Sequence, residues 1–425
     1  MAKFNRRDFI KNLTACACGT TISKGLLPFS DSLAFAQSNC SSNRKVLVSI
    51  FLAGGPHGPS ILVPRNTQAY FDKHPLVGIE NSLFLDNTHG LHPEMVNLHN
   101  LYNEGKLALM NGGGYPGHSR SHADSTDLMG RGIFNNRNEG TGWAGRFVKN
   151  YCSPNEVFSL FSFRGNISET KAPGVTPPSA TDLNSFGFGS DSVGSGTGRN
   201  ENNAFIRQVI AENRLLNKNH NPHQQELLKS WETAESAVSR IAQINSGYSS
   251  SVTYPGGLGT RLRDAAKLIL SPLVSVKNIF VSQGGYDTHG NQNNNLPGLL
   301  RSLDLSISAF WQDMVAAGRD NDVVVVFYGE FGRTHQNNNV DQNGNPSPGT
   351  DHGTGTFIGV LGNNVRGGVL SPAYTNADFT APQPWVPVKF DYREVMSQIF
   401  ARHLSVDPGP IFPEAFNKIG INLFR

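Results

Sequence analysis

The 425-residue sequence predicts an α/β fold, a mostly parallel sheet sandwiched by helices, with a helical and loop-rich insertion. Two observations predict it. Short, continuous runs of apolar and β-branched residues alternate with stretches of helical periodicity, which is the pattern of a sheet buried on both faces. Most of these runs end in a cluster of Gly, His, Asp or Glu, as expected where strands deliver polar residues to one edge of a sheet.

Residues 45 to about 130 contain two predicted strands and two predicted helices. Residues 45–53 form an apolar run that predicts a buried strand, which ends at a Gly-Gly-Pro turn. Residues 93–104 carry apolar side chains at helical spacing. Residues 106–110 predict a second strand, and the Asn and three glycines at 111–114 predict a turn. We expect a helix to begin after Ser121.

A central insertion interrupts this pattern, and we place it at about 153–255. Its segment 184–200 is rich in Gly and Ser and predicts a loop, while 204–244 is mostly helical in pattern with an interruption near 219–222. The regular alternation then resumes. We expect helices at 262–270, 299–317 and 392–404, and strands at 278–282, 322–328 and 356–361. The sequence therefore predicts a single α/β domain from residue 37 to residue 425.

The N-terminus predicts export. Arg6 and Arg7 precede an apolar pair and Lys11, which is typical of a twin-arginine signal. A weakly apolar stretch and a small-x-small site ending at Ala36 follow in the expected order. We therefore expect a signal peptide at 1–36, the twin-arginine translocase as a partner during export, and a periplasmic or secreted protein. An amphipathic N-terminus without targeting function is the alternative, and a lipobox at 13–16 is disfavoured because too few apolar residues precede it.

Composition limits the remaining function classes. The net charge of +3 is too small to indicate nucleic-acid binding. After Ala36 no run of about 18 apolar residues remains, so we expect no transmembrane segment in the mature chain. Two cysteines remain after cleavage, Cys40 and Cys152, and an oxidising periplasm would allow them to form a disulfide. Two unpaired thiols are the alternative.

Five polar clusters follow predicted strands or precede the next one. They comprise residues 54–58, 118–122, 287–289, 330–334 and 351–353. Each cluster alone is a weak signal, because an isolated Asp or His after a strand is commonly a turn or capping residue. Their occurrence at successive strand ends indicates that they converge on one crevice.

The chemistry of these clusters favours a metal site. Asp287, His289 and His352 would give a divalent metal, zinc in our expectation, three ligands and leave one coordination position open. Ser119 and Ser121 lie where a helix begins, and a hydroxyl there could attack an ester. Further candidate residues lie in the same clusters: Arg120, which suits a phosphate or sulfate group, His122, Asp351 and Arg333, which could equally form a structural ion pair.

Across these segments the chain resembles a bacterial family of twin-arginine-exported proteins that is defined only as a domain of unknown function. That family is placed in the alkaline phosphatase and sulfatase superfamily. The matching segments are RRDFIK, GGPHG, LHPEMVNLHNLYNEGKLALMNG, HSRSHADSTDLM, GYDTHGNQ, VVVVFYGEFGRT, TDHGTG and FDYREVMSQIF. They cover most of the mature chain except the insertion, and they imply an alkaline-phosphatase-like fold.

The resemblance also implies a two-metal site. By chain order, Asp287, His289 and His352 match the ligands of one metal, and Glu330 and His57 stand where the ligands of a second are found. Ser119 or Ser121 stands where the nucleophile is found. Two departures from the family pattern weaken the prediction of a second metal: His57 replaces the usual aspartate, and Phe331 follows Glu330 where a histidine is usual. One metal or none remains an alternative.

These observations together predict an exported metal-dependent hydrolase with a small anionic phosphate or sulfate ester as substrate. The alternative is a non-catalytic exported protein that keeps the scaffold and binds a partner or the cell surface.

Overall fold

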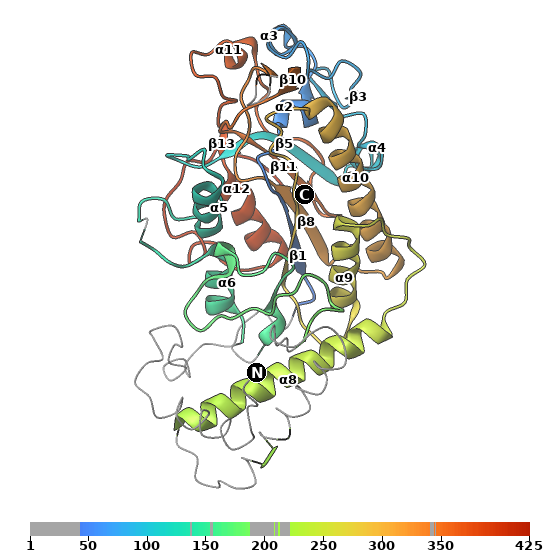
Figure 1. Ribbon diagram of the computed structural model, residues 1–425, viewed down its shortest axis with the longest axis vertical. Coiled ribbons are helices and arrows are strands. Elements are labelled where there is room, and N and C mark those ends of the chain that lie inside the picture. Colours follow the sequence, from blue (N-terminus) through green and yellow to red (C-terminus); the bar gives the residue numbers. More distant parts are fainter. Residues whose placement is uncertain are drawn as a thin grey trace, which may run out of the picture. The chain divides into compact units, whose positions relative to one another are not determined.

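The computed structural model describes residues 43–136, 138–153, 156–187, 208, 211–212, 222–340, 344 and 346–425 (Figure 1). The predicted signal peptide and Cys40 lie outside these residues. The described residues form two compact units: those within 183–247 belong to the smaller one, and residues 43–182 and 248–425 belong to the larger one. The larger unit carries the sheet, and the single domain expected from the sequence stays a prediction.

The larger unit is built on one mixed sheet. Its strands follow the order β12-β5-β11-β8-β1-β7-β6, and β13 also pairs with β5. β1 is parallel to β7 and β8, β6 is parallel to β7, and β12 and β13 are parallel to β5, whereas β11 is antiparallel to both of its neighbours. The mostly parallel sheet predicted from the sequence is confirmed. The strands are β1 (Val46–Leu52), β5 (Leu107–Gly114), β6 (Leu160–Ser162), β7 (Asn278–Gln283), β8 (Val323–Tyr328), β11 (Thr356–Leu361), β12 (Gly368–Val369) and β13 (Phe390–Asp391).

Helices cover both faces of this sheet. Figure 1 shows α9 (Leu258–Leu270), α10 (Gln292–Ala316) and α4 (Val96–Asn103) on one side, and α5 (His122–Arg131), α6 (Trp143–Tyr151) and α12 (Tyr392–Gln398) on the other. The shorter elements are α2 (Gly58–Ile61), α3 (Gln68–Lys73), α11 (Asn376–Phe379), and two small sheets, β2 (Leu62–Pro64) with β4 (His89–Leu91) and β3 (Leu83–Phe84), and β9 (Asn338–Val340) with β10 (Pro346–Gly349).

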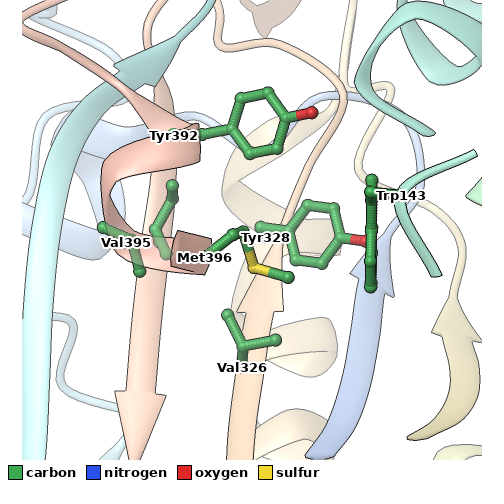
Figure 2. A pocket seen from close by; sticks show the side chains of 7 residues that line it. Trp143, Val326, Tyr328, Tyr392, Val395 and Met396 are labelled. Carbon is green, nitrogen blue, oxygen red and sulfur yellow. The ribbon is translucent and has the colours of Figure 1, made fainter. Parts of the chain in front are cut away.

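The core explains why the apolar runs become strands. Every residue of β1 and β8 is buried, because helices cover both faces of the sheet. Burying one such aliphatic side chain stabilises the fold by about 1.5–3 kcal/mol. Between β8, β11 and α12 lies a small apolar pocket, lined by Trp143, Val326, Tyr328, Ile358, Tyr392, Val395 and Met396 (Figure 2). The pocket carries no histidine or carboxylate, so it belongs to the packing of the core.

The glycines at 112–114 do not form the predicted turn. They continue β5, which runs to Gly114. A Cβ on Gly113 would lie 2.6 Å from the side chain of Ile358, and one on Gly114 would lie 2.5 Å from Val388. The turn prediction was wrong because these glycines allow neighbouring backbone segments to approach β5 closely.

One strand of the main sheet lies within the stretch that the sequence marks as an insertion. β6 lies within the predicted insertion but pairs with β7, so it is a strand of the main sheet. The smaller unit contains α8 (Pro222–Gly247), which matches the predicted helical segment. The predicted loop at 184–200 lies mostly outside the described residues.

Two further expectations concern export. Cys152 is disulfide-bonded, and Cys16, Cys18 and Cys40 all lie outside the described residues, so the choice of Cys40 as its partner stays a prediction. In the part of the chain that the structure describes, no helix has the length and apolar character needed to cross a bilayer.

We expect the fold to lose stability in mild acid. Burial lowers the pKa of His74, His92 and His403 from 6.5 to about 4. Between these values the unfolded chain binds protons that the folded chain does not, so the free energy of unfolding decreases as the pH falls from 6.5 towards 4. At pH 5 each group should cost about 2 kcal/mol.

Urea unfolding at pH 7.5 and pH 5.0 checks this expectation. The midpoint should be lower at pH 5.0, and His403→Gln, which keeps a donor for the Val46 carbonyl, should reduce the difference. Equal wild-type midpoints at the two pH values would contradict it.

Candidate metal centre

The five polar clusters meet at one edge of the sheet. β1, β7 and β8 are mutually parallel. β5 runs in the same direction, because β5 and β8 are each antiparallel to β11. The loops that follow these four strands therefore leave at the edge from which β11 starts. They carry, in order, Gly54, His122, Asp287 and Glu330, and the loop before β11 carries His352.

Asp287 lies at the centre of the cluster. Its Oδ1 is 3.0 Å from His289 Nε2, 3.0 Å from His352 Nε2 and 2.7 Å from Arg333 Nη1. Its Oδ2 is 3.3 Å from His122 Nε2. The predicted set of Asp287, His289 and His352 is thus in mutual contact, and His122 joins it.

The three imidazoles are oriented in the same way. His122 Nδ1 lies 2.7 Å from Glu330 Oε1, His289 Nδ1 lies 2.7 Å from Asp351 Oδ1, and His352 Nδ1 lies 2.8 Å from the Arg120 carbonyl oxygen. Carboxylates and carbonyls only accept hydrogen bonds, so each Nδ1 carries the proton and donates it. In the neutral imidazole each Nε2 then holds a lone pair, as in ligand histidines fixed by an outer partner.

The Nε2 atoms of these imidazoles lie close to one carboxylate and to one another. His289 Nε2 and His352 Nε2 are 2.9 Å apart, and each lies 3.0 Å from Asp287 Oδ1. The ligand atoms of His122, Asp287 and His352 lie within 4.8 Å of one another. Imidazole nitrogens and a carboxylate oxygen at about 2.0–2.2 Å from the ion are the ligands of zinc in proteins. The donor set therefore fits a borderline divalent metal.

The charge of the cluster supports the same conclusion. Asp287, Glu330 and Asp351 contribute three negative charges and Arg333 one positive charge, so with neutral imidazoles the sum is −3 + 1 = −2. A divalent cation neutralises this cluster.

Two carboxyl groups of the cluster, those of Asp287 and Asp351, are held in their charged form. Partial burial raises the pKa of Asp287, but the hydrogen bond and charge of Arg333 outweigh it, and the resulting pKa is about 2. Burial likewise raises the pKa of Asp351, and His289 and Asn338 more than offset this, so its pKa is lowered. The hydrogen bond to Glu330 raises the pKa of His122. A proton therefore competes with a metal at His122 Nε2 as the pH falls.

Arg333 forms a buried ion pair with Asp287. Its side chain is fully buried, and besides Asp287 it donates to the Thr350 carbonyl and lies 3.3 Å from the Gly54 carbonyl. Thr350 Oγ1 in turn donates to Gln292 Oε1 at 2.7 Å. These hydrogen bonds fix the buried guanidinium of Arg333 beside Asp287.

The residues expected to hold a second metal have other partners. Glu330 Oε1 accepts from the Gly54 amide at 2.9 Å and from His122 Nδ1, so it orients a histidine. His57 is buried, its Nδ1 lies 2.7 Å from Ser60 Oγ, and its Nε2 has no hydrogen-bond partner among the described residues. Glu330 Oε2 likewise has no hydrogen-bond partner among the described residues. His57 stands at the N-cap position of α2 without a side-chain capping hydrogen bond, and a role of these two residues at a second metal stays a prediction.

The predicted serines stand next to the cluster. Ser121 is exposed, is the N-cap of α5 and directly precedes His122, and its side chain makes no capping hydrogen bond. Its amide donates to Ser119 Oγ at 3.1 Å. Arg120 lies between the two serines. Its carbonyl oxygen accepts a hydrogen bond from His352 Nδ1, and its guanidinium stacks over the ring of Trp385 at 4.3 Å from the ring centroid. Segment 119–122 is thus attached to the cluster at both Arg120 and His122.

Sequence reasoning assigned His122 no ligand role and passed over Trp385 entirely. A signal for His122 was present, because HSRSH places a second histidine at the start of a helix that follows a strand. No signal could have found Trp385, since its partner is 265 positions away, at Arg120 (385 − 120 = 265).

We expect Gly54→Ala to disturb the cluster. Gly54 has a φ of 117°, and a Cβ there would lie 2.3 Å from the backbone nitrogen of Asp287. The substitution should lower the free energy of unfolding by about 2–3 kcal/mol and weaken metal binding. Gly117→Ala is the matched control, because Gly117 also has a positive φ, 64°, but open space around its Cβ position. Equal losses in urea unfolding for the two variants would show that close approach to Asp287 does not matter.

Comparison with known proteins gives the following similarities. Residues 273–383 match the family model described as "Protein of unknown function (DUF1501)", and this segment contains Asp287, Glu330, Arg333 and His352. No curated protein matches the chain in sequence.

Among solved structures, the zinc complex of the C-terminal periplasmic domain of EcEptC from Escherichia coli is 8% identical, with a TM-score of 0.37, over 86% of this chain and 85% of that one. The lipoteichoic acid synthase LtaP from Listeria monocytogenes is 10% identical, with a TM-score of 0.37, over 82% of this chain and 76% of that one. A protein of the alkaline phosphatase superfamily from Vibrio parahaemolyticus is 11% identical, with a TM-score of 0.33, over 85% of this chain and 69% of that one.

Proposed function

We propose that the chain is an exported metal-dependent hydrolase of phosphate or sulfate esters. The observation that carries the proposal is the convergence of three imidazole Nε2 atoms on Asp287, each with its Nδ1 fixed by an outer acceptor. A divalent metal held by Asp287, His289 and His352, with His122 beside them, would polarise an ester oxygen. We propose zinc, because imidazole nitrogen and carboxylate oxygen are its usual ligands.

The remaining steps fall to the chain's own residues. Arg333 keeps the Asp287 carboxylate ionised and in place, and Glu330, Asp351 and the Arg120 carbonyl keep the imidazoles in the ligand tautomer. Ser121 Oγ would form a bond to the phosphorus or sulfur of the ester while the alcohol leaves with the hydroxyl proton. Water would then cleave the serine ester. The Arg120 guanidinium would steady the anion.

Export completes the proposal. The twin-arginine signal at 1–36 would carry the folded protein to the periplasm or out of the cell, where the oxidising environment would allow a disulfide between Cys40 and Cys152. Export in the folded state suits a protein that binds its metal before translocation.

The experiment combines elemental analysis with ester assays. Protein purified without a chelator should carry about one zinc per chain, and it should cleave p-nitrophenyl phosphate, p-nitrophenyl sulfate or bis(p-nitrophenyl) phosphate. Metal-free protein that cleaves none of these esters would end the proposal. Metal-loaded protein without any ester cleavage would support the non-catalytic alternative.

Ser121→Ala should reduce ester hydrolysis by at least about 1000-fold and leave the metal content unchanged, because the hydroxyl is the proposed nucleophile. Ser119→Ala should cost less, and Ser249→Ala, at an exposed position outside the cluster, should have no effect. If Ser121→Ala keeps full activity and Ser119→Ala loses it, the nucleophile is Ser119. If both keep full activity, hydrolysis uses no serine nucleophile.

A further inference from the structure

We infer that the site selects esters with a single negative charge, namely sulfate monoesters and phosphodiesters, over phosphate monoesters with two. The inference rests on the proposed function and concerns the substrate class of the same site. It follows from the charges of the cluster and from an exposed cation beside it, Arg120.

The inner cluster becomes neutral when a divalent cation binds. Asp287 contacts all three imidazoles, while Glu330 and Asp351 each hold one imidazole by its Nδ1. With Arg333 the sum is −2, so a bound dication brings it to zero. No surplus positive charge then remains in the inner cluster for the substrate.

The two buried arginines near the cluster are occupied. Arg333 is fully buried and its terminal nitrogens bond to Asp287 and to the carbonyl of Thr350. Arg164 pairs with Glu169 at 2.7 Å, and only 7% and 2% of these side chains are exposed. Neither guanidinium can reach a substrate at the mouth of the site. The charge count uses one dication, because the described residues hold one group of three converging ligand atoms, on His122, Asp287 and His352.

Arg120 is a cation beside the cluster that a substrate can reach. It is exposed, forms no ion pair with any described carboxylate, and its own carbonyl holds His352. Trp385 fixes the guanidinium by stacking at 4.3 Å. Trp385 itself is fixed beside the cluster, since it forms a β-bridge with Thr334, the residue after Arg333. Stacking covers one face of the guanidinium and leaves its N–H edge free to bind two oxygens of one oxyanion.

Charge matching then decides the substrate class. The metal-loaded cluster together with Arg120 carries a net charge of +1, which a monoanionic ester neutralises. A dianionic phosphate monoester would leave one negative charge uncompensated beside three carboxylates. At such short range an uncompensated charge weakens binding by at least about tenfold.

Calorimetric titration of the metal-loaded protein tests the inference by binding alone. The probes are methyl sulfate and dimethyl phosphate, which are monoanions, and methyl phosphate at pH 8, which is a dianion. One of the two monoanions should bind at least about tenfold more tightly than methyl phosphate, and the comparison between them separates a sulfate site from a phosphodiester site. Tighter binding of methyl phosphate than of both monoanions would overturn the inference.

A charge-changing variant makes the test independent of substrate shape. In Asp351→Asn the amide oxygen can still accept from His289 Nδ1, but the cluster loses one negative charge. With metal in excess, the preference for the monoanion should therefore shrink by about tenfold. Asp86→Asn is the matched control, because Asp86 also contacts a histidine, His89 at 3.1 Å, on β4. An unchanged ratio in Asp351→Asn would contradict charge matching.

Arg120 and Trp385 have separable roles in this account. Arg120→Ala should weaken binding of the preferred monoanion by about tenfold with no change in metal content, because the carbonyl that holds His352 is retained. Trp385→Ala should weaken binding of the same monoanion by less than Arg120→Ala does. Trp385→Phe should bind it as tightly as the wild type, because Phe can still stack on the guanidinium, as expected of a positioning residue. Unaltered binding in Arg120→Ala would remove Arg120 from the site.

Failure of the inference and failure of the proposed function are distinguishable. A protein that hydrolyses p-nitrophenyl phosphate faster than the sulfate and the diester, and binds methyl phosphate most tightly, keeps the proposed function and loses this inference. A protein that hydrolyses none of the three esters loses both.

Discussion

His352→Ala should abolish metal binding and ester hydrolysis while leaving the protein folded. His352 Nε2 lies 3.0 Å from Asp287 Oδ1 and 2.9 Å from His289 Nε2, so its removal opens the centre of the ligand set. Loss of one of the few protein ligands should lower the metal content to under about a tenth of an equivalent and reduce hydrolysis by at least about 100-fold. Elemental analysis and ester assays on the same sample measure both.

His99→Ala provides the control for this variant. His99 is also partly exposed, but its Nε2 bonds to the Phe84 carbonyl on β3, outside the cluster. This variant should keep full metal content and activity. A His352→Ala protein with one bound metal per chain would show that His352 is not a ligand.

Arg333→Ala should have the largest effect on stability. Arg333 is fully buried, and its removal leaves the carbonyls of Thr350 and Gly54 without their donor and Asp287 without its counter-charge. Breaking a buried ion pair by removing one partner costs about 3–5 kcal/mol, and we expect the lower end because the Asp287 side chain is 43% exposed. The urea midpoint should fall at an unchanged slope.

Arg301→Ala is the matched control for a charged pair at the surface. Arg301 contacts Glu94 at 2.6 Å, but its side chain is 61% exposed. Its urea midpoint should stay close to that of the wild type. Equal midpoint shifts in the two variants would mean that burial of Arg333 contributes nothing.

The sequence predicted the sheet and the meeting of the clusters because both follow from local patterns. The apolar runs that became β1 and β8 fit strands of a covered sheet best, and polar residues that follow parallel strands lie at the same edge of the sheet. Asp287, His289 and His352 were selected as ligands for the same reason, and the structure brings them into contact. For these residues, position in the chain carried the necessary information.

The division of roles within the site could not be read from the chain. Whether Glu330 binds a metal or orients His122 depends on a 2.7 Å contact between side chains 208 positions apart. The burial of His57 beside Ser60 could not be predicted either, because it depends on how α2 packs. The glycines of β5 were misread for a similar reason, since the side chains that approach them come from other parts of the chain. Tertiary packing decides each of these cases.

X-ray absorption spectroscopy at the metal edge, on protein purified without a chelator, tests the central claim most directly. We expect a site with histidine nitrogens from His289, His352 and His122 and one carboxylate oxygen from Asp287 at about 2.0–2.2 Å, and loss of one nitrogen scatterer or of the metal in His352→Ala. A bound metal whose spectrum shows sulfur ligands or no imidazole, or whose spectrum is unchanged in His352→Ala, would contradict this account.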